Sequence, residues 1–330
     1  MSNTSEFETL ASSPSMQAVL RQVACAAAGR DHVLITGEPG TGREGIAREI
    51  HRRSSAAAVF VKVTSTRTVP EAFEHDLFGF HSGRPGGEER RNLERIAQGG
   101  QLHDALGGTV FFEQLTEIPA RIQARLARLF RDREAMIVED RTTVGFDVRA
   151  IVAADRTYDE AVEEGRVRSD LHKVISTVRI DVPPLRARRE DIPRLAGHLL
   201  AAIGVRSGEP PKTLSEPALQ LLAALPWPGN VRELECLLQG LAQRVRADVI
   251  RLEDVLASVQ LDGRSIPSAA GGTLREARAR FEREYIAAAL DQHSGRIPDA
   301  ARMLGIQRTN LYRKLKHLKI PIDKRRPLTP

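Results

Sequence analysis

The fold of this chain is decided by the stretch Gly37-Glu38-Pro39-Gly40-Thr41-Gly42-Arg43-Glu44-Gly45. It has the layout of a phosphate-binding loop, G-x-x-x-x-G-K-[ST], with Arg43 at the lysine position. In such a loop the backbone N–H groups cradle the phosphates, and the lysine reaches the β- and γ-phosphates. We therefore expect residues 37–44 to bind a nucleotide. The site differs from the pattern at Arg43, the position of a lysine that normally supports hydrolysis.

The segments around the loop alternate between strand and helix patterns. Apolar runs predict strands at 31–36, 59–63, 110–112 and 147–153. One helix is predicted over 43–53. A second helix follows Pro119 and has an apolar face formed by Ile122, Leu126, Leu129 and Phe130. This alternation indicates an α/β fold, with a parallel sheet covered by helices on both faces.

The pattern becomes helical after Pro183 and Pro184. Helices are predicted at 190–204, 215–225 and 229–246, with no strand signal between them. Residues 261–272 have the composition of a flexible linker, and 273–320 are helical again. We expect a tail at 1–10, an α/β nucleotide-binding part at 11–185, a helical subdomain at 186–260, the linker, a small all-α domain at 273–322 and a basic tail at 323–330.

Charge is spread unevenly along the 330 residues. The chain has a net charge of +6, but residues 273–330 carry 14 basic and 6 acidic side chains, which leaves −2 for the remainder. A basic module on a near-neutral body suggests binding to a polyanion; the alternative is a solvated charged tail.

Cysteine content and hydropathy exclude several classes of protein. Cys25 and Cys236 form neither a disulfide framework nor a metal-ligand spacing, and we expect both to act as small hydrophobes. No apolar run reaches the ~18–20 residues that span a bilayer. The first ten residues lack the apolar core of a signal peptide, so we expect a cytoplasmic protein without membrane contact.

Seven collinear stretches carry a resemblance that extends over almost the whole chain. They are SPSMQAVLRQV (13–23), GEPGTGREGIAREIHRRS (37–54), HDLFG (75–79), GGTVFFEQLTEIP (107–119), EEGRVRSDLHKV (163–174), PPLRARREDIP (183–193) and WPGNVRELE (227–235). The chain resembles the bacterial enhancer-binding proteins, the AAA+ activators of sigma-54 RNA polymerase with a Fis-type DNA-binding domain. The resemblance implies an AAA+ parallel sheet, a helical lid and a helix-turn-helix domain.

The chain departs from this family at its nucleotide site. Arg43 replaces the loop lysine, and a planar guanidinium does not substitute conservatively for a compact ammonium at a crowded phosphate. The family's Asp-Glu pair is Glu113-Gln114 here. Glu113 would be the ligand of a nucleotide-bound Mg²⁺, which demands near-ideal geometry. Gln114 stands at the position of the catalytic glutamate and cannot accept a proton.

Further positions follow from the resemblance. Thr64 and Asp155 stand where the family has asparagines. Arg168 and Lys173 take the places of two trans-acting arginines, and Arg168 is the candidate arginine finger. Arg232 matches the lid arginine that senses nucleotide. We expect ATP or ADP to bind with reduced affinity and to be hydrolysed little or not at all. The residues expected to bind it are Gly37, Glu38, Pro39, Gly40, Thr41, Gly42, Arg43, Glu44, Glu113 and Arg232. The alternative is an empty site in a fold that serves only for assembly.

The family's GAFTGA loop, which contacts sigma-54, is not recognisable in residues 77–88. The segment is rich in Pro and Gly and leads into the four charged residues 88–91; a plain surface turn is the ordinary interpretation. Together with Gln114, the loss of this loop predicts a protein that does not remodel sigma-54 RNA polymerase.

The C-terminal segment predicts a helix-turn-helix. Gly305 supplies the turn, and Leu311, Leu315 and Leu318 line one face of the helix that follows. The opposite face carries the candidate DNA-binding residues Arg308, Thr309, Asn310, Arg313, Lys314 and Lys316. Arg and Asn can read base edges, whereas the lysines suit phosphates. The segment resembles the Fis-type domain; a helical hairpin that does not bind DNA is the alternative.

Three functions remain open on the sequence. The first is a DNA-binding regulator, a dimer or larger ring, with the AAA+ body as a nucleotide-sensitive platform. The second is an active ATPase that remodels RNA polymerase. The third is an inactive subunit that joins rings of a related AAA+ regulator. No receiver domain fits before residue 11, so we expect control by a partner, a ligand or abundance.

Overall fold

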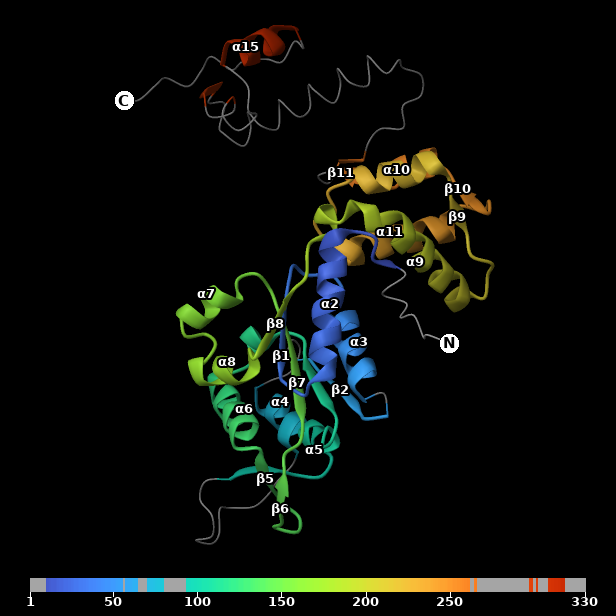
Figure 1. Ribbon diagram of the computed structural model, residues 1–330. Coiled ribbons are helices and arrows are strands. Elements are labelled where there is room, and N and C mark those ends of the chain that lie inside the picture. The colour runs from blue at the N-terminus through green and yellow to red at the C-terminus, as the bar shows by residue number, and fades with distance from the viewer. Residues whose placement is uncertain are drawn as a thin grey trace. The chain divides into compact units, whose positions relative to one another are not determined.

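The computed structural model describes residues 10–55, 57–64, 70–79, 93–261, 264–265, 297–298, 301 and 308–317. They belong to two units, 1–258 and 259–330. The first unit contains a central sheet with its helical layers, followed by a helical subdomain (Figure 1).

Five parallel strands form the central sheet in the order β2-β4-β7-β1-β8. Their bounds are β1 (Val33–Thr36), β2 (Phe60–Val63), β4 (Thr109–Phe112), β7 (Arg149–Ala154) and β8 (Val178–Asp181). β1 lies between β7 and β8, so that Val33 is aligned with both Ile151 and Val178. The predicted parallel sheet and its four predicted strands are confirmed, whereas β8 was not predicted.

Helices cover both faces of this sheet (Figure 1). One layer consists of α2 (Pro14–Ala28) and α3 (Arg43–Ser55). The other consists of α4 (Pro70–Phe78), α5 (Gln101–Asp104), α6 (Ala120–Asp132), α7 (Tyr158–Glu163) and α8 (Ser169–Ile175). Because side chains alternate across a strand, Val33 and Ile35 pack in the first layer and Leu34 in the second.

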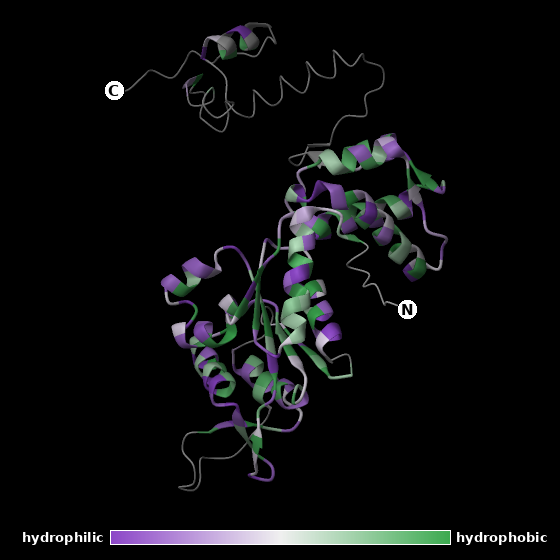
Figure 2. Ribbon diagram, in the orientation of Figure 1, coloured by the Kyte–Doolittle hydropathy of each residue, from purple (hydrophilic) through white to green (hydrophobic). Residues whose placement is uncertain are grey.

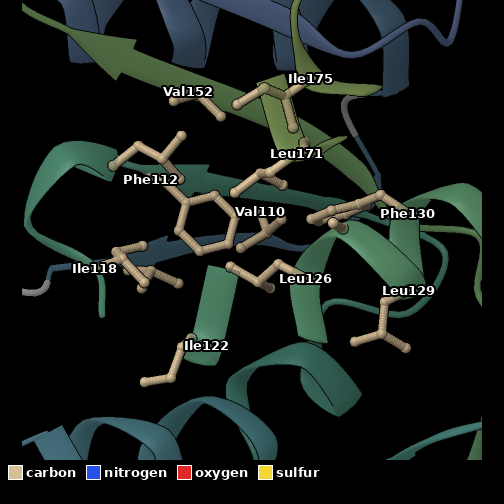
Figure 3. Close-up of a cluster of buried hydrophobic side chains, with 14 of the residues drawn as sticks. Val110, Phe112, Ile118, Ile122, Leu126, Leu129, Phe130, Val152, Leu171 and Ile175 are labelled. Atoms are coloured by element: carbon tan, nitrogen blue, oxygen red, sulfur yellow. The ribbon is translucent and has the colours of Figure 1, made fainter. Parts of the chain in front are cut away.

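The predicted apolar face of α6 is confirmed. Ile122, Leu126, Leu129 and Phe130 are all buried, and they gather around Phe112 in the second layer (Figure 3). Burying each such side chain contributes about 1.5–3 kcal/mol. In Figure 2 the inner strands of the central sheet are mainly hydrophobic, as expected for strands buried on both faces.

A second, three-stranded sheet was not predicted. It consists of β3 (Glu94–Ile96), β5 (Glu134–Ile137) and β6 (Thr143–Gly145), with β3 parallel and β6 antiparallel to β5. These strands are short and partly polar, and they lack the long apolar runs that mark the central sheet.

The chain after β8 forms the helical subdomain. Two 3₁₀ turns, η2 (Leu185–Ala187) and η3 (Arg189–Asp191), lead into α9 (Ile192–Ser207), α10 (Glu216–Ala224), α11 (Asn230–Arg244) and α12 (Leu252–Leu256). The three predicted helices are present. The expectation of no strand between them is wrong, because β9 (Thr213–Leu214) pairs in parallel with β10 (Val249–Ile250). Each has only two residues, too few for a hydropathy signal.

The first helix is fastened to this subdomain at Asp191. The Ser13 hydroxyl accepts a hydrogen bond from the N–H of Met16, 3.3 Å away, and so caps α2. The same hydroxyl donates to Asp191 Oδ2 at 2.7 Å. The backbone N–H groups of Ser12 and Ser13 each donate to Asp191 Oδ1 at 2.6 Å. The start of α2 therefore depends on a side chain at the base of α9.

The second unit is described only in part. β11 (Gln260–Leu261) and β12 (Arg264–Ser265) form an antiparallel pair at the beginning of the segment that was predicted to be a linker. α15 (Arg308–His317) buries Leu311 and Leu315, which confirms these two positions of the predicted inner face. Leu318 and Gly305 lie outside the described residues.

Neither cysteine lies in the interior of the protein. Cys25 and Cys236 are exposed, so the expectation that they act as small hydrophobes is wrong. Within the described part of the chain, none of the helices combines the length and apolar character needed to cross a bilayer.

Candidate nucleotide-binding site

The glycine-rich loop connects the end of β1 to the start of α3. Gly40 and Gly42 have φ angles of 78° and 98°, which favour glycine. The hydroxyl and the N–H of Thr41 both donate to the carbonyl of Glu38, at 2.8 and 3.3 Å. The turn therefore ends at the N-terminus of a 13-residue helix, where free N–H groups and the helix dipole favour an anion.

Arg43 is held at the ends of two neighbouring strands. Its Nη1 donates to the carbonyl of Gly37 at 3.1 Å and to the carbonyl of Ala154. Burial lowers the pKa of Arg43, and the charges of Asp155 and Glu113 act in the opposite direction. The guanidinium stays charged at neutral pH, because arginine titrates far above it.

Glu113 follows β4 and forms an ion pair that the sequence did not predict. Its Oε2 lies 3.1 Å from Lys62 Nζ on β2 and accepts a hydrogen bond from the Thr64 hydroxyl at 3.5 Å. Lys62 Nζ also lies 2.7 Å from Glu44 Oε2, at the start of α3. The second oxygen of Glu44 pairs with Arg48 at 2.9 Å. One ammonium thus joins the phosphate loop to the end of β4.

The pKa values of this cluster follow from its contacts. Partial burial lowers the pKa of Lys62, but its hydrogen bonds to Glu44 and Glu113 outweigh burial, so the net shift is upward. Burial raises the pKa of Glu44, but Lys62 and Arg48 outweigh it and hold that pKa below its usual value. Lys62 and Glu44 therefore remain charged at neutral pH.

The residues at this point do not fit the Mg²⁺ that such loops hold. Magnesium takes oxygen ligands in near-ideal octahedral geometry at about 2.0–2.1 Å. Here an ammonium lies between the two carboxylates that would supply those oxygens. Glu44 also stands where the loop pattern has a Ser or Thr hydroxyl for the metal. Among the described residues, no cluster of three or more His, Cys, Asp or Glu side chains is placed to hold a metal ion.

Gln114 and Asp155 occupy the carboxyl ends of neighbouring strands. Gln114 begins the 3₁₀ turn η1 (Leu115–Glu117), and its carbonyl accepts from the N–H of Glu117 at 3.4 Å. Asp155 Oδ1 accepts from the N–H and hydroxyl of Thr157, at 3.1 and 2.8 Å, and so closes a local turn. The Asp155 carboxylate is thus engaged in shaping its own loop.

The helical subdomain lies directly on the phosphate loop. The carbonyl of Gly40 accepts hydrogen bonds from the N–H groups of Val231 and Arg232, at 2.9 and 3.3 Å. The side-chain amide of Asn230, which is fully buried, donates to the carbonyl of Pro39 at 3.0 Å. A Cβ added to Gly40 would lie 2.3 Å from the carbonyl oxygen of Gly229. The side chain of Arg232 is exposed beside the loop.

Glu38 ties the loop to the subdomain by charge. Both of its oxygens accept hydrogen bonds from Arg186, at 2.7 and 2.5 Å, and Arg156 lies 3.5 Å away. The Arg186 hydrogen bonds, with help from Asn230 and against a smaller effect of burial, lower the pKa of Glu38 to about 2. Buried Arg188 adds a hydrogen bond to the carbonyl of Thr41 at 2.7 Å.

The structure brings most of the predicted nucleotide residues together. Glu113 and Glu44 of the loop both pair with Lys62, and Arg232 lies beside Gly40 of the loop. Arg168 belongs to another part of the molecule, at the start of α8. Arg168 caps α8, and its guanidinium binds Asp170 at 2.8 and 3.0 Å. Lys173, on the same helix, is exposed. Sequence reasoning missed Lys62, Asn230, Arg186 and Arg188, whose partners lie far away in the chain.

The candidate DNA-binding residues lie on α15 or next to it in sequence. Arg308, Thr309 and Arg313 are exposed on the helix that buries Leu311 and Leu315. Asn310, Lys314 and Lys316 belong to the same helix. The segment that was compared with the GAFTGA loop is described only as far as Gly79, so that prediction lies outside the described residues.

Family models match three consecutive parts of the chain. They are the sigma-54 interaction domain at residues 9–181, the AAA+ ATPase lid domain at 186–270 and the bacterial regulatory protein, Fis family, at 277–318.

Known proteins match over nearly the full length. The transcriptional regulatory protein ZraR of Escherichia coli (strain K12) is 35% identical over 320 residues, which cover 94% of this chain and 69% of ZraR. The DNA-binding transcriptional regulator NtrC of the same organism is 33% identical over 334 residues, covering 94% of this chain and 70% of NtrC.

Solved structures give the same result. The crystal structure of NtrX from Brucella abortus in complex with ADP has a TM-score of 0.64 at 30% identity, covering 96% of this chain and 70% of NtrX. The complex of NtrX with ATP has a TM-score of 0.63. RuvB from Thermotoga maritima, at 14% identity and a TM-score of 0.52, shares the fold. This chain therefore belongs to the sigma-54 activator family of DNA-binding transcription regulators, with an AAA+ domain, its helical lid and a Fis-type helix-turn-helix domain.

Proposed function

We propose that this regulator binds ATP or ADP weakly through its AAA+ domain, hydrolyses it slowly or not at all, and uses the domain as an oligomerisation platform. The parts are the tail (1–10), the α/β part of the AAA+ domain (11–185), its lid (186–260), the linker (261–272), the DNA-binding domain (273–322) and the basic tail (323–330). Because its target is chromosomal DNA, we place it in the cytoplasm.

Nucleotide binding is supported by the loop, the lid and the relatives. Backbone N–H groups at the start of α3 are suited to phosphates, and the lid lies against Gly40 through two hydrogen bonds. Crystal structures of the related NtrX contain ADP or ATP. The proposed contacts are Gly37, Glu38, Pro39, Gly40, Thr41, Gly42, Arg43, Glu44, Glu113 and Arg232.

Gln114 is the single observation that carries the proposed loss of hydrolysis. It follows Glu113 at the carboxyl end of β4, where the family has its catalytic glutamate, and an amide cannot take a proton from water. Glu113 does not replace that base, because its carboxylate is engaged by Lys62. Loss of such a base commonly lowers the rate by about 10²–10⁴.

Phosphate release from ATP tests this proposal. The purified full chain is compared with its Gly42→Ala variant, which strains the loop at a φ of 98°. We expect both proteins to give the same low background rate. A wild-type turnover equal to that of an active relative, abolished in Gly42→Ala, would refute the proposal and establish an active ATPase.

DNA binding itself follows from the family, and the residues that perform it are proposed. Arg308, Thr309 and Asn310 stand at the start of α15, the end of a recognition helix that meets base edges. Arg313, Lys314 and Lys316 suit phosphates. We propose a dimer or larger ring that does not remodel sigma-54 polymerase. Activation of its promoter in cells lacking sigma-54 tests this point; complete dependence on sigma-54 contradicts it.

One observation favours a second function, in which this protein joins a ring of active AAA+ relatives and stimulates their ATP hydrolysis. Arg168 is exposed at the start of α8, as a residue that serves a neighbouring subunit must be. An arginine finger supplied in trans stabilises the transition state of a neighbour's nucleotide. We expect this protein to raise hydrolysis by an active relative and Arg168→Ala to abolish the effect. Arg30→Ala, which removes an exposed arginine paired with an aspartate at 2.8 Å, as Arg168 is paired with Asp170, is the matched control.

A further inference from the structure

We propose that the ammonium of Lys62 takes the place of Mg²⁺ at this site, so that a nucleoside diphosphate or triphosphate binds without a divalent metal. The inference rests on the proposed nucleotide binding and adds that the metal is dispensable. It concerns Lys62, Glu44 and Glu113, which come from β2, α3 and the end of β4.

The geometry places one cation between two carboxylates. Lys62 Nζ lies 2.7 Å from Glu44 Oε2 and 3.1 Å from Glu113 Oε2, both within hydrogen-bonding distance. An ammonium has three N–H donors, so one remains after these two contacts. The side chain of Lys62 is one-third exposed, which leaves its head accessible to a phosphate bound at the loop.

The same contacts oppose a metal. Glu113 Oε2 already accepts from Lys62 and Thr64, and Glu44 is divided between Lys62 and Arg48. A dication in this place would need to displace an ammonium from two carboxylates. If it entered beside Lys62 instead, the two cations would repel each other at close range. Both routes are unfavourable compared with leaving the ion pairs intact.

The remaining positive charge suffices for a phosphate without the metal. Arg43 lies at the loop, and its guanidinium is oriented by the carbonyls of Gly37 and Ala154. The N-terminus of α3 adds its backbone donors. Lys62 supplies a third positive element at the point where the metal would lie.

Titration with fluorescent ADP in EDTA and in Mg²⁺ tests the inference on the full chain. We expect wild type to bind ADP at least as tightly in EDTA as in Mg²⁺. Lys62→Ala should bind about 10- to 100-fold more weakly in EDTA, because it loses a hydrogen bond to a charged group. In this variant Mg²⁺ should restore affinity, because Glu44 and Glu113 are then free to accept it. Arg30→Ala, which removes one exposed positive charge before the start of β1, is the charge-matched control.

A second readout does not depend on the variant folding. When wild-type protein is added to Mn²⁺ and ADP, the paramagnetic resonance signal of free Mn²⁺ should not fall, and it should rise as the protein withdraws ADP from its Mn²⁺ complex. A protein-dependent loss of the free Mn²⁺ signal overturns the inference, as does wild-type binding that requires Mg²⁺, and the proposed nucleotide binding then survives. Equal metal independence in Lys62→Ala also overturns it. No binding in either buffer overturns both proposals.

Discussion

Gly40→Ala should detach the lid from the phosphate loop. The new Cβ would lie 2.3 Å from the carbonyl oxygen of Gly229 and 3.1 Å from the Cβ of Arg232. The first distance is to backbone, so α11 or the loop must shift. That shift breaks the hydrogen bonds that Gly40 accepts from Val231 and Arg232.

The loss in the free energy of unfolding has two parts, which a control variant can separate. Alanine at a φ of 78° costs about 1–2 kcal/mol on its own. Each broken hydrogen bond adds about 0.5–1.5 kcal/mol. We therefore expect the free energy of unfolding to fall by about 2–5 kcal/mol. Gly99 has a φ of 79° and nothing within 4 Å of an added Cβ, so Gly99→Ala should show only the first part.

Urea denaturation of the two variants measures the difference, and nucleotide titration follows it. Gly40→Ala should be less stable than Gly99→Ala by the cost of the lid contact, and it should also bind fluorescent ADP more weakly. Equal stabilities of the two variants would refute the reasoning, because the lid would then not rest on Gly40 in solution.

Three further outcomes are expected. Gln114→Glu should raise ATP hydrolysis by about 10² or more in a phosphate-release assay, and an unchanged rate contradicts the assignment of this position. The folded-state pKa of Glu38 is depressed to about 2 from 4.5, so its stabilising effect is complete above pH 4.5 and is lost as the pH falls towards 2. Acid unfolding of Glu38→Gln should lack this component; an identical pH profile contradicts the Arg186 pair. Arg308→Ala should relax base preference by about 1–3 kcal/mol at one position, whereas Lys316→Ala should weaken all DNA and lower the salt slope by about 1. Equal effects in a mobility-shift assay would contradict these separate roles.

The central sheet was predictable because its strands are buried on both faces. β1 is apolar throughout, from Val33 to Ile35, and no amphipathic alternation obscures it. β8 was missed because it lies at an edge and carries Arg179 and Asp181 among its four residues. The pair β9 and β10 is specified by tertiary contacts rather than by local sequence, since each strand has only two residues.

In the candidate site, too, some residues could be recognised from local sequence and others are placed by tertiary contacts. The loop and Arg232 could be recognised from local patterns, but the place of Lys62 could not. Its position opposite Glu113 depends on β2 pairing with β4, in a register that aligns Lys62 with Phe111. Strand order is not encoded in the hydropathy of either segment. A lysine in an apolar run is otherwise indistinguishable from one that extends into solvent.

The contacts of Asp191 couple the first turn of α2 to the orientation of the lid. One carboxylate at the hinge receives two backbone N–H groups and the hydroxyl that caps the opening turn of α2. A rotation that withdraws Asp191 would leave these donors unsatisfied and would fray that turn. The order of the first turn of α2 would therefore depend directly on the position of the lid, without any change in the central sheet.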